Sequence, residues 1–210
     1  MIKILATLIT GLSLLFTAAY SQAQTTSFEY EARIIQSWGA SGIAVGDTVS
    51  GDFTYVLGQT GHQVSLIVPG FTTRYNNGVF TAKTQNQLVY STGGQIEIKN
   101  DVQAFGTIVW DGVLIDASDR YGSIKMGSIN GFALKDMQIL LTNLVGQPFT
   151  NTLLPAELDL ANYPSSKRFL MTFEGNGGGV IGEITLLENC VLNTKIPYLG
   201  CTKLENSINF

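Results

Sequence analysis

Three aspartates stand close together in the segment Asp111-Gly112-Val113-Leu114-Ile115-Asp116-Ala117-Ser118-Asp119. Carboxylate oxygens are the ligands that a hard cation such as Ca²⁺ prefers, although this spacing is not that of an EF-hand loop. Aspartate in loops also serves to turn the chain. Calcium is therefore a candidate cofactor, with Asp111, Asp116 and Asp119 as its candidate ligands.

Paired carboxylates could also hydrolyse a glycosidic bond, which needs two carboxyl groups about 5–5.5 Å or 6.5–9.5 Å apart on one side of a cleft. Asp111 and Asp116 are five residues apart, so an unbulged strand would point them to opposite faces. Glu29 and Glu31 share a face at about 7 Å, but their apolar neighbours indicate a solvated outer surface. An extracellular polysaccharide hydrolase using the Asp111–Asp119 region is an alternative function.

Nucleophilic catalysis finds little support in the sequence. His62 is the single histidine, and no serine stands in a Gly-x-Ser-x-Gly elbow. We therefore assign no catalytic residue and favour a protein that is not an enzyme.

Four aromatic residues lie outside the clearest core patterns: Trp38, Tyr75, Trp110 and Tyr121. An aromatic ring can stack on a sugar ring with little loss of conformational entropy. Large aromatic side chains are more often buried in the core. These four are the candidate ligand-binding residues.

The two cysteines, Cys190 and Cys201, stand close together near the C-terminus. One histidine and no further cysteine cannot complete a zinc site. In an oxidising compartment we expect a disulfide that closes a C-terminal loop and stabilises the fold by about 3 kcal/mol.

The first residues have the pattern of a secretory signal peptide, with Lys3, an apolar run over Ile4–Phe16 and the small-x-small sequence Ser21-Gln22-Ala23. The apolar run is shorter than the ~20 residues that span a bilayer. We expect cleavage after Ala23, leaving residues 24–210 as a single domain in the periplasm or outside the cell.

The net charge of the chain limits the classes of partner that it can bind. The chain has 12 basic and 16 acidic residues, a net charge of −4, and removal of Lys3 makes it one unit more negative. No cluster of Lys and Arg offsets this, so nucleic acid is excluded as an expected partner. No later apolar run is long enough for stable membrane insertion.

Alternation of apolar and polar residues dominates the rest of the chain and predicts β-strands with one buried face. It is clearest over Phe28–Ile34 and Val49–Leu57. Further strands are expected over 78–83, 87–91, 95–99, 105–109, 113–116, 132–142, 168–174 and 180–187, with Gly175–Gly179 as a hairpin connection. A short helix or 3₁₀ turn is expected over Pro155–Ala161. The fold class is an all-β antiparallel sandwich, jelly-roll-like, with little helix.

Three segments resemble bacterial secreted proteins that often carry a PEP-CTERM sorting tag for exosortase. They are Val45-Gly46-Asp47-Thr48-Val49-Ser50-Gly51-Asp52-Phe53-Thr54-Tyr55, Leu154-Pro155-Ala156-Glu157-Leu158-Asp159-Leu160, and Phe169–Phe173 followed by Gly182–Leu187. The resemblance implies an extracellular β-sandwich-like domain and no common activity. The tag itself is missing, since no Pro-Glu-Pro, apolar helix and arginine cluster follow Leu187. Gly51 is expected to let the strand bend or be approached closely.

The function that these observations favour is a secreted binding or matrix-type protein, with a carbohydrate or cell-surface polymer as the expected partner. The polysaccharide hydrolase is one alternative. A small outer-membrane β-barrel is another, because Leu204, Ile208 and Phe210 alternate as in the last strand of such proteins.

Overall fold

The structure is a computed structural model that describes residues 24–64, 68–76, 78–84, 87–104, 108–118, 122–145 and 148–190. Regular structure in these ranges is almost entirely β. The exceptions are two short 3₁₀ turns, η2 (Leu160–Asn162) and η3 (Gly175–Gly177). No helix in these ranges has the length and apolar character needed to cross a membrane.

The strands in chain order are β1 (Thr25–Trp38), β2 (Thr48–Val56), β3 (His62–Gln63), β4 (Phe71–Asn76), β5 (Val79–Thr84), β6 (Gln87–Thr92), β7 (Gln95–Ala104), β8 (Ile108–Asp116), β9 (Ile124–Met126), β10 (Ser128–Ile129), β11 (Phe132–Asn143), β12 (Ser166–Phe173) and β13 (Gly179–Cys190).

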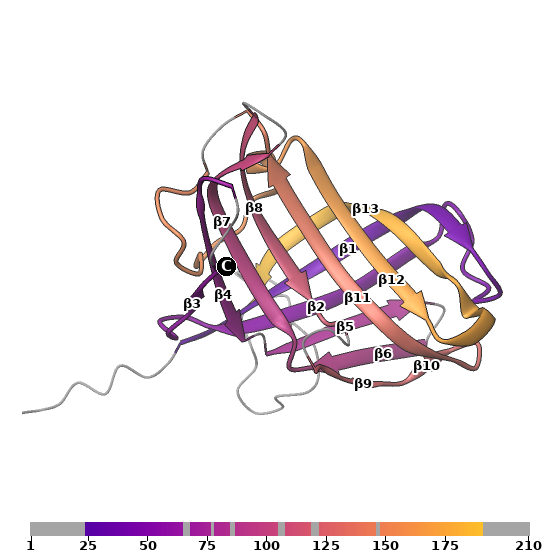
Figure 1. Cartoon of the computed structure of the whole chain (residues 1–210). Helices are drawn as coiled ribbons and strands as arrows, with labels where there is room; N and C mark the ends of the chain where they lie inside the picture. The colour runs from indigo at the N-terminus through magenta and orange to yellow at the C-terminus, as the bar shows by residue number, and fades with distance from the viewer. Residues whose placement is uncertain are drawn as a thin grey trace, which may run out of the picture.

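These strands form one antiparallel sheet in the order β3-β4-β7-β8-β11-β12-β13-β1-β2-β5-β6-β9, with β10 paired to β11. The sheet curls into a half-barrel, so that β7, β8, β11 and β12 cross over β1, β2, β5 and β6 (Figure 1). The predicted all-β antiparallel class is confirmed. Two separate sheets are not, because β13 pairs with both β12 and β1 and makes the described strands continuous.

The core lies on the inside of this curl. One cross-strand row of core side chains runs through Tyr75, Ile96, Ile115, Ile139, Phe169, Gly182 and Ile34. The two halves of the sheet meet through aromatic rings, because the Tyr30 ring centroid of β1 lies 5.6 Å from that of Phe169 of β12. Within the β1, β2, β5 and β6 half, the same ring lies 5.9 Å from that of Phe80. Burial of this apolar face is the main force that holds the curl.

The opposite side of the sheet is the outer face. Its side chains alternate with those of the core, because successive residues of a strand point to opposite sides. The cross-strand row directly beside the core row consists of Arg74, Glu97, Leu114, Leu140, Arg168, Glu183 and Arg33. We call this set the outer row.

Strand β8 differs from the sequence prediction. We expected separate strands over 105–109 and 113–116. Ile108–Asp116 is instead one strand, and it pairs with β11 from Asp111 to Asp116. Within this strand, the Asp111 carboxylate accepts two backbone hydrogen bonds, as described below.

The turn expected over Pro155–Ala161 is confirmed only at its end. There Asp159 caps η2, because its side chain accepts a hydrogen bond from the Ala161 N–H at 2.8 Å.

Residues 148–159, which we call the strap, pack against the inner face of the sheet. The Tyr75 hydroxyl donates to the carbonyl of Thr152 at 2.7 Å, and the Tyr55 hydroxyl donates to that of Pro155 at 2.5 Å. Phe149 lies beside Tyr163, with their ring centroids 6.3 Å apart. Two tyrosines from opposite halves of the sheet therefore fix one segment.

Elsewhere, a single asparagine joins three segments. The Asn130 Nδ2 donates to the Ser41 carbonyl at 2.6 Å, and its backbone N–H donates to Gln87 Oε1 at 2.6 Å. The Gln87 Nε2 donates back to Asn130 Oδ1 at 3.1 Å. The β1–β2 loop, the start of β6 and the β10–β11 turn are thus held together.

Candidate functional site

Trp110 lies on the outer face of β8, against a strand glycine. A Cβ atom on Gly112 would stand 2.9 Å from Trp110 Cζ3 and 3.3 Å from Cε3. The indole therefore uses the space that a side chain at position 112 would fill. Glycine within a strand often marks such a close approach.

Lys99 of β7 covers the Trp110 ring from the neighbouring strand. Its register partner is Gly112, and its Nζ lies 4.9 Å from the centre of the Trp110 ring. A cation within about 6 Å of an aromatic face is attracted to the ring quadrupole. This attraction holds the ammonium group at the outer surface of β8.

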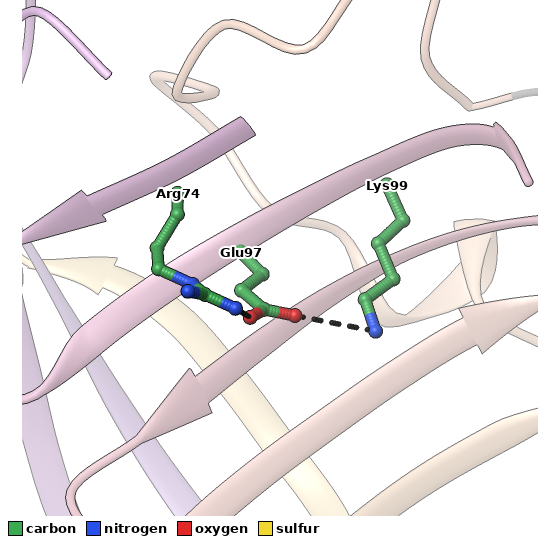
Figure 2. Close-up of polar contacts among 3 residues, drawn as sticks. All are labelled: Arg74, Glu97 and Lys99. Carbon is green, nitrogen blue, oxygen red and sulfur yellow. Dashed lines mark hydrogen bonds and ion pairs between the residues drawn. The ribbon is translucent and has the colours of Figure 1, made fainter. Parts of the chain in front are cut away.

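The same ammonium is shared with a carboxylate. Glu97 Oε2 lies 3.3 Å from Lys99 Nζ, and Glu97 Oε1 accepts from Arg74 Nε at 2.9 Å and Nη2 at 2.6 Å. Figure 2 shows the Glu97 carboxylate between the two cations, which extend from neighbouring strands. Arg74 and Lys99 are therefore held in place by one central glutamate. We call Arg74, Glu97, Lys99 and Trp110 the charged cluster.

The ionisation of Glu97 follows from this arrangement. Burial of its carboxyl would by itself raise the pKa, but the hydrogen bond from Arg74 and the charges of Lys99 and Arg74 outweigh burial and hold the pKa below its usual value. The side chain is only 8% exposed. Glu97 is therefore a fixed anion in the neutral pH range.

Trp38 repeats the arrangement of Trp110 at the other end of the outer face. It is the last residue of β1 and the register partner of Gly179 in β13. A Cβ atom on Gly179 would stand 2.7 Å from Trp38 Cζ2, and the Trp38 side chain remains 45% exposed. Both tryptophans thus cover a glycine of the outer face.

The other two predicted aromatic residues are not part of this surface. Tyr75 is buried in the core and its hydroxyl is bonded to the strap, so it offers no exposed ring to a ligand. The prediction that Tyr75 binds a ligand is therefore wrong. Tyr121 lies outside the described residues.

The aspartates predicted as metal ligands have other partners. Asp111 is fully buried, and its Oδ1 accepts from the Asp101 N–H at 2.7 Å while Oδ2 accepts from the Phe149 N–H at 3.1 Å. Asp116 Oδ1 accepts from the Ser118 N–H at 2.9 Å. β8 alternates without a bulge between them, so Asp111 and Asp116 point to opposite faces. Asp119 lies outside the described residues.

Burial is the main influence on the ionisation of Asp111. It raises the pKa, although the backbone donors Asp101 and Phe149 act in the opposite direction. Asp111 thus joins the bulge in β7 to the strap. Among the described residues, no group of three His, Cys, Asp or Glu side chains is arranged to hold a metal ion.

The remaining candidates are placed as follows. Glu29 and Glu31 lie on the outer face of β1 as expected, and Asp52 of β2 is the register partner of Glu29. His62 is exposed in the short strand β3. Cys190 ends β13, and its expected partner Cys201 lies outside the described residues, so the disulfide stays a prediction.

Sequence reasoning missed Arg74, Glu97 and Lys99. The strand β4 was not predicted, which hid Arg74. Glu97 and Lys99 fall on the polar alternation of Gln95–Lys99, a pattern that also fits any solvated strand face. Their meeting with Trp110 depends on the pairing of β7 with β8.

No protein-family model matches this chain, and neither do any curated proteins or solved structures compared with it. On the outer face, the two tryptophans present flat apolar area, and the cluster beside Trp110 presents fixed charges and hydrogen-bond donors.

Proposed function

We propose that this chain is a secreted, non-catalytic binding protein that holds a polysaccharide along the outer face of its sheet, between Trp110 and Trp38. The observation that carries the proposal is that both rings stand over a glycine on the outer face, Trp38 exposed and Trp110 half-buried beside Lys99. Each covers a glycine of the outer face, and neither belongs to the buried core. Rings supported in this way lose little entropy when a sugar ring packs on them.

The dimensions of the face suit an extended polymer. Trp110 stands on β8 and Trp38 on β1, four strand positions away in the sheet. The register places them about eight residues apart along the strand direction. Strand spacing and rise then put the rings on the order of 30 Å apart. A chain of several sugars spans such a distance without requiring an enclosed pocket.

The location outside the cytoplasm is part of the proposal. It is supported by the signal-like residues 1–23, by the two cysteines and by the resemblance to secreted proteins that often bear a sorting tag. We classify the curled sheet as sandwich-like. This is supported by the contact of Tyr30 with Phe169 across the core.

Affinity electrophoresis of the purified chain in gels containing a panel of polysaccharides tests the proposal. We expect retardation by at least one polymer, and a loss of affinity of about tenfold in Trp38→Ala and in Trp110→Ala. Phe71→Ala is the matched control, because Phe71 is 59% exposed and points away from the outer face.

Circular dichroism of each variant establishes that the fold is retained. Binding to no polysaccharide would overturn the proposal. Equal losses in the tryptophan variants and in Phe71→Ala would also overturn it, because the rings of the outer face would then have no special part in binding.

A further inference from the structure

We propose that the polymer is an acidic polysaccharide whose carboxylate or sulfate groups bind along the outer row. This inference rests on the proposed function and adds the chemical class of the ligand. It depends on how cations are distributed over the strands of the outer face.

The first group of cations is the charged cluster. Arg74 and Lys99 both contact the Glu97 carboxylate, and Lys99 at 19% exposure remains open to solvent. Because Lys99 lies over the Trp110 ring, this ring meets a ligand together with an ammonium group. A sugar that carries an anionic substituent can bind both, whereas a neutral sugar gains only the ring contact.

The second group of cations lies on β12 and β1, again beside a glutamate. In register, Arg168 of β12 and Arg33 of β1 stand on either side of Glu183 of β13. All three side chains are exposed. Two arginines beside one glutamate leave a positive region, and guanidinium groups match the geometry of carboxylate and sulfate oxygens.

Two leucines separate these groups. Leu114 of β8 and Leu140 of β11 are register partners and lie half-buried in the outer row. Glu97 and Glu183 are four strand positions apart, which corresponds to about 19 Å at normal strand spacing. The row thus alternates cation, apolar and cation regions, as an acidic chain with apolar sugar faces requires.

Acidic residues limit where a polyanion can lie. Glu29 of β1 has Glu188 and Asp52 as register partners on its two sides, and Glu31 follows on the same face. This acidic area begins beyond Arg33 along β1. It repels an anionic polymer and excludes it from this part of the outer face. Two further carboxylates, Asp116 and Asp136, lie on the other side of the outer row, where they accept hydrogen bonds from Ser118 and Thr172.

The test compares polymers that differ in charge. Dissociation constants of the purified chain are measured for polygalacturonate, for dextran sulfate and for neutral dextran, with poly-glutamate as an anionic polymer without sugars. We expect the acidic polysaccharides to bind at least tenfold more tightly than dextran. Affinity should fall steeply between 0.05 and 0.5 M salt (about 14 to 4 Å of screening length), since exposed charges are screened.

Single substitutions test which part of the outer face binds the polymer. Lys99→Gln and Arg168→Gln should each weaken binding of the acidic polysaccharides about two- to fivefold, as is typical of exposed ion pairs. Lys83→Gln is the matched control, because Lys83 is an exposed lysine of β5 away from the outer row. Loss in this control equal to that in the Lys99 and Arg168 variants would overturn the proposed binding surface.

The remaining outcomes separate the two proposals. Equal affinity for dextran and for the acidic polymers overturns this inference and leaves the proposed function standing. Poly-glutamate binding as tightly as polygalacturonate overturns the requirement for sugar, and with it both proposals. Stronger binding of dextran sulfate or of polygalacturonate identifies the anionic group and supports the inference in either case.

Discussion

Tyr30 and Gly51 face each other as cross-strand partners, and the missing side chain of Gly51 makes room for the Tyr30 hydroxyl. That hydroxyl donates to the Thr81 carbonyl at 2.7 Å. A Cβ atom on Gly51 would stand 2.1 Å from the same carbonyl oxygen and 2.8 Å from the hydroxyl. One glycine therefore allows three strands to share a buried hydrogen bond.

Gly51→Ala should lower the free energy of unfolding by about 1–3 kcal/mol, because the backbone of β5 must move away from the new methyl group. Tyr30→Phe, which removes only the hydroxyl, should lower it by about 0.5–1.5 kcal/mol. Urea denaturation followed by tryptophan fluorescence measures both. A Gly51→Ala protein as stable as the wild type would show that the approach of Thr81 is not tight in solution.

The close approach at Gly51 was predicted from the Val45–Tyr55 segment, and the strands β1, β2, β11, β12 and β13 were predicted near their observed positions. Their success has a common cause, since each buries one face and so alternates clearly. The strand β4 was missed because its adjacent residues Thr72 and Thr73 are both polar, which obscures the alternation, although both are buried. Pairing order depends on contacts between distant segments, and a curled single sheet has the same alternation as two packed sheets.

Asp111→Asn should destabilise the protein by about 1–3 kcal/mol. An amide offers one acceptor where the carboxylate offers two, so either the Asp101 N–H or the Phe149 N–H loses its partner. Hydrogen exchange should become faster at Phe149. Glu157→Gln, on the exposed part of the strap, is the control. If exchange at Phe149 were unchanged, the carboxylate would not be what holds the strap to β8.

The charged cluster gives the protein a defined response to acid. Because the pKa of Glu97 is lower in the folded state, its contribution to stability is complete above the usual pKa of about 4.3 and is lost as the pH falls through the folded value. Glu97→Gln should be about 1.5 kcal/mol less stable at pH 7, and this difference should shrink toward pH 3.

Denaturant unfolding of both proteins across this pH range measures the effect of Glu97. The control variant is Glu174→Gln, because Glu174 is exposed in the β12–β13 connection. A stability difference that stayed constant down to pH 3 would contradict the assigned role of Glu97.

Asn130→Asp should loosen the junction between the β1–β2 loop and the β10–β11 turn. The substitution removes the Nδ2 donor to the Ser41 carbonyl and places a carboxylate beside that carbonyl oxygen. It should lower the free energy of unfolding by about 1 kcal/mol. Asn130→Gly relieves the positive φ of 50° but removes all side-chain bonds. Amide exchange near Ser41 should rise in both variants, and unchanged exchange would exclude the junction as a fastening point.

The candidate site could be predicted only in part. Trp38 and Trp110 were selected because they stand outside the core alternation, and both lie on the outer face. Tyr75 was selected for the same reason and is buried, because the strap covers it. Nothing in the local sequence shows that a distant segment will cover a strand. For the same reason the contact between Arg74 and Glu97 could not be predicted, because these residues lie 23 positions apart in the sequence.

Among the strands that the structure describes, the sheet begins and ends in very short ones, since β3 has two residues and β9 has three. Long unpaired edge strands can form backbone hydrogen bonds with strands of other chains. Edge strands as short as β3 and β9 offer few backbone groups for such pairing. Such short edges disfavour edge-to-edge growth into fibrils when the protein is concentrated.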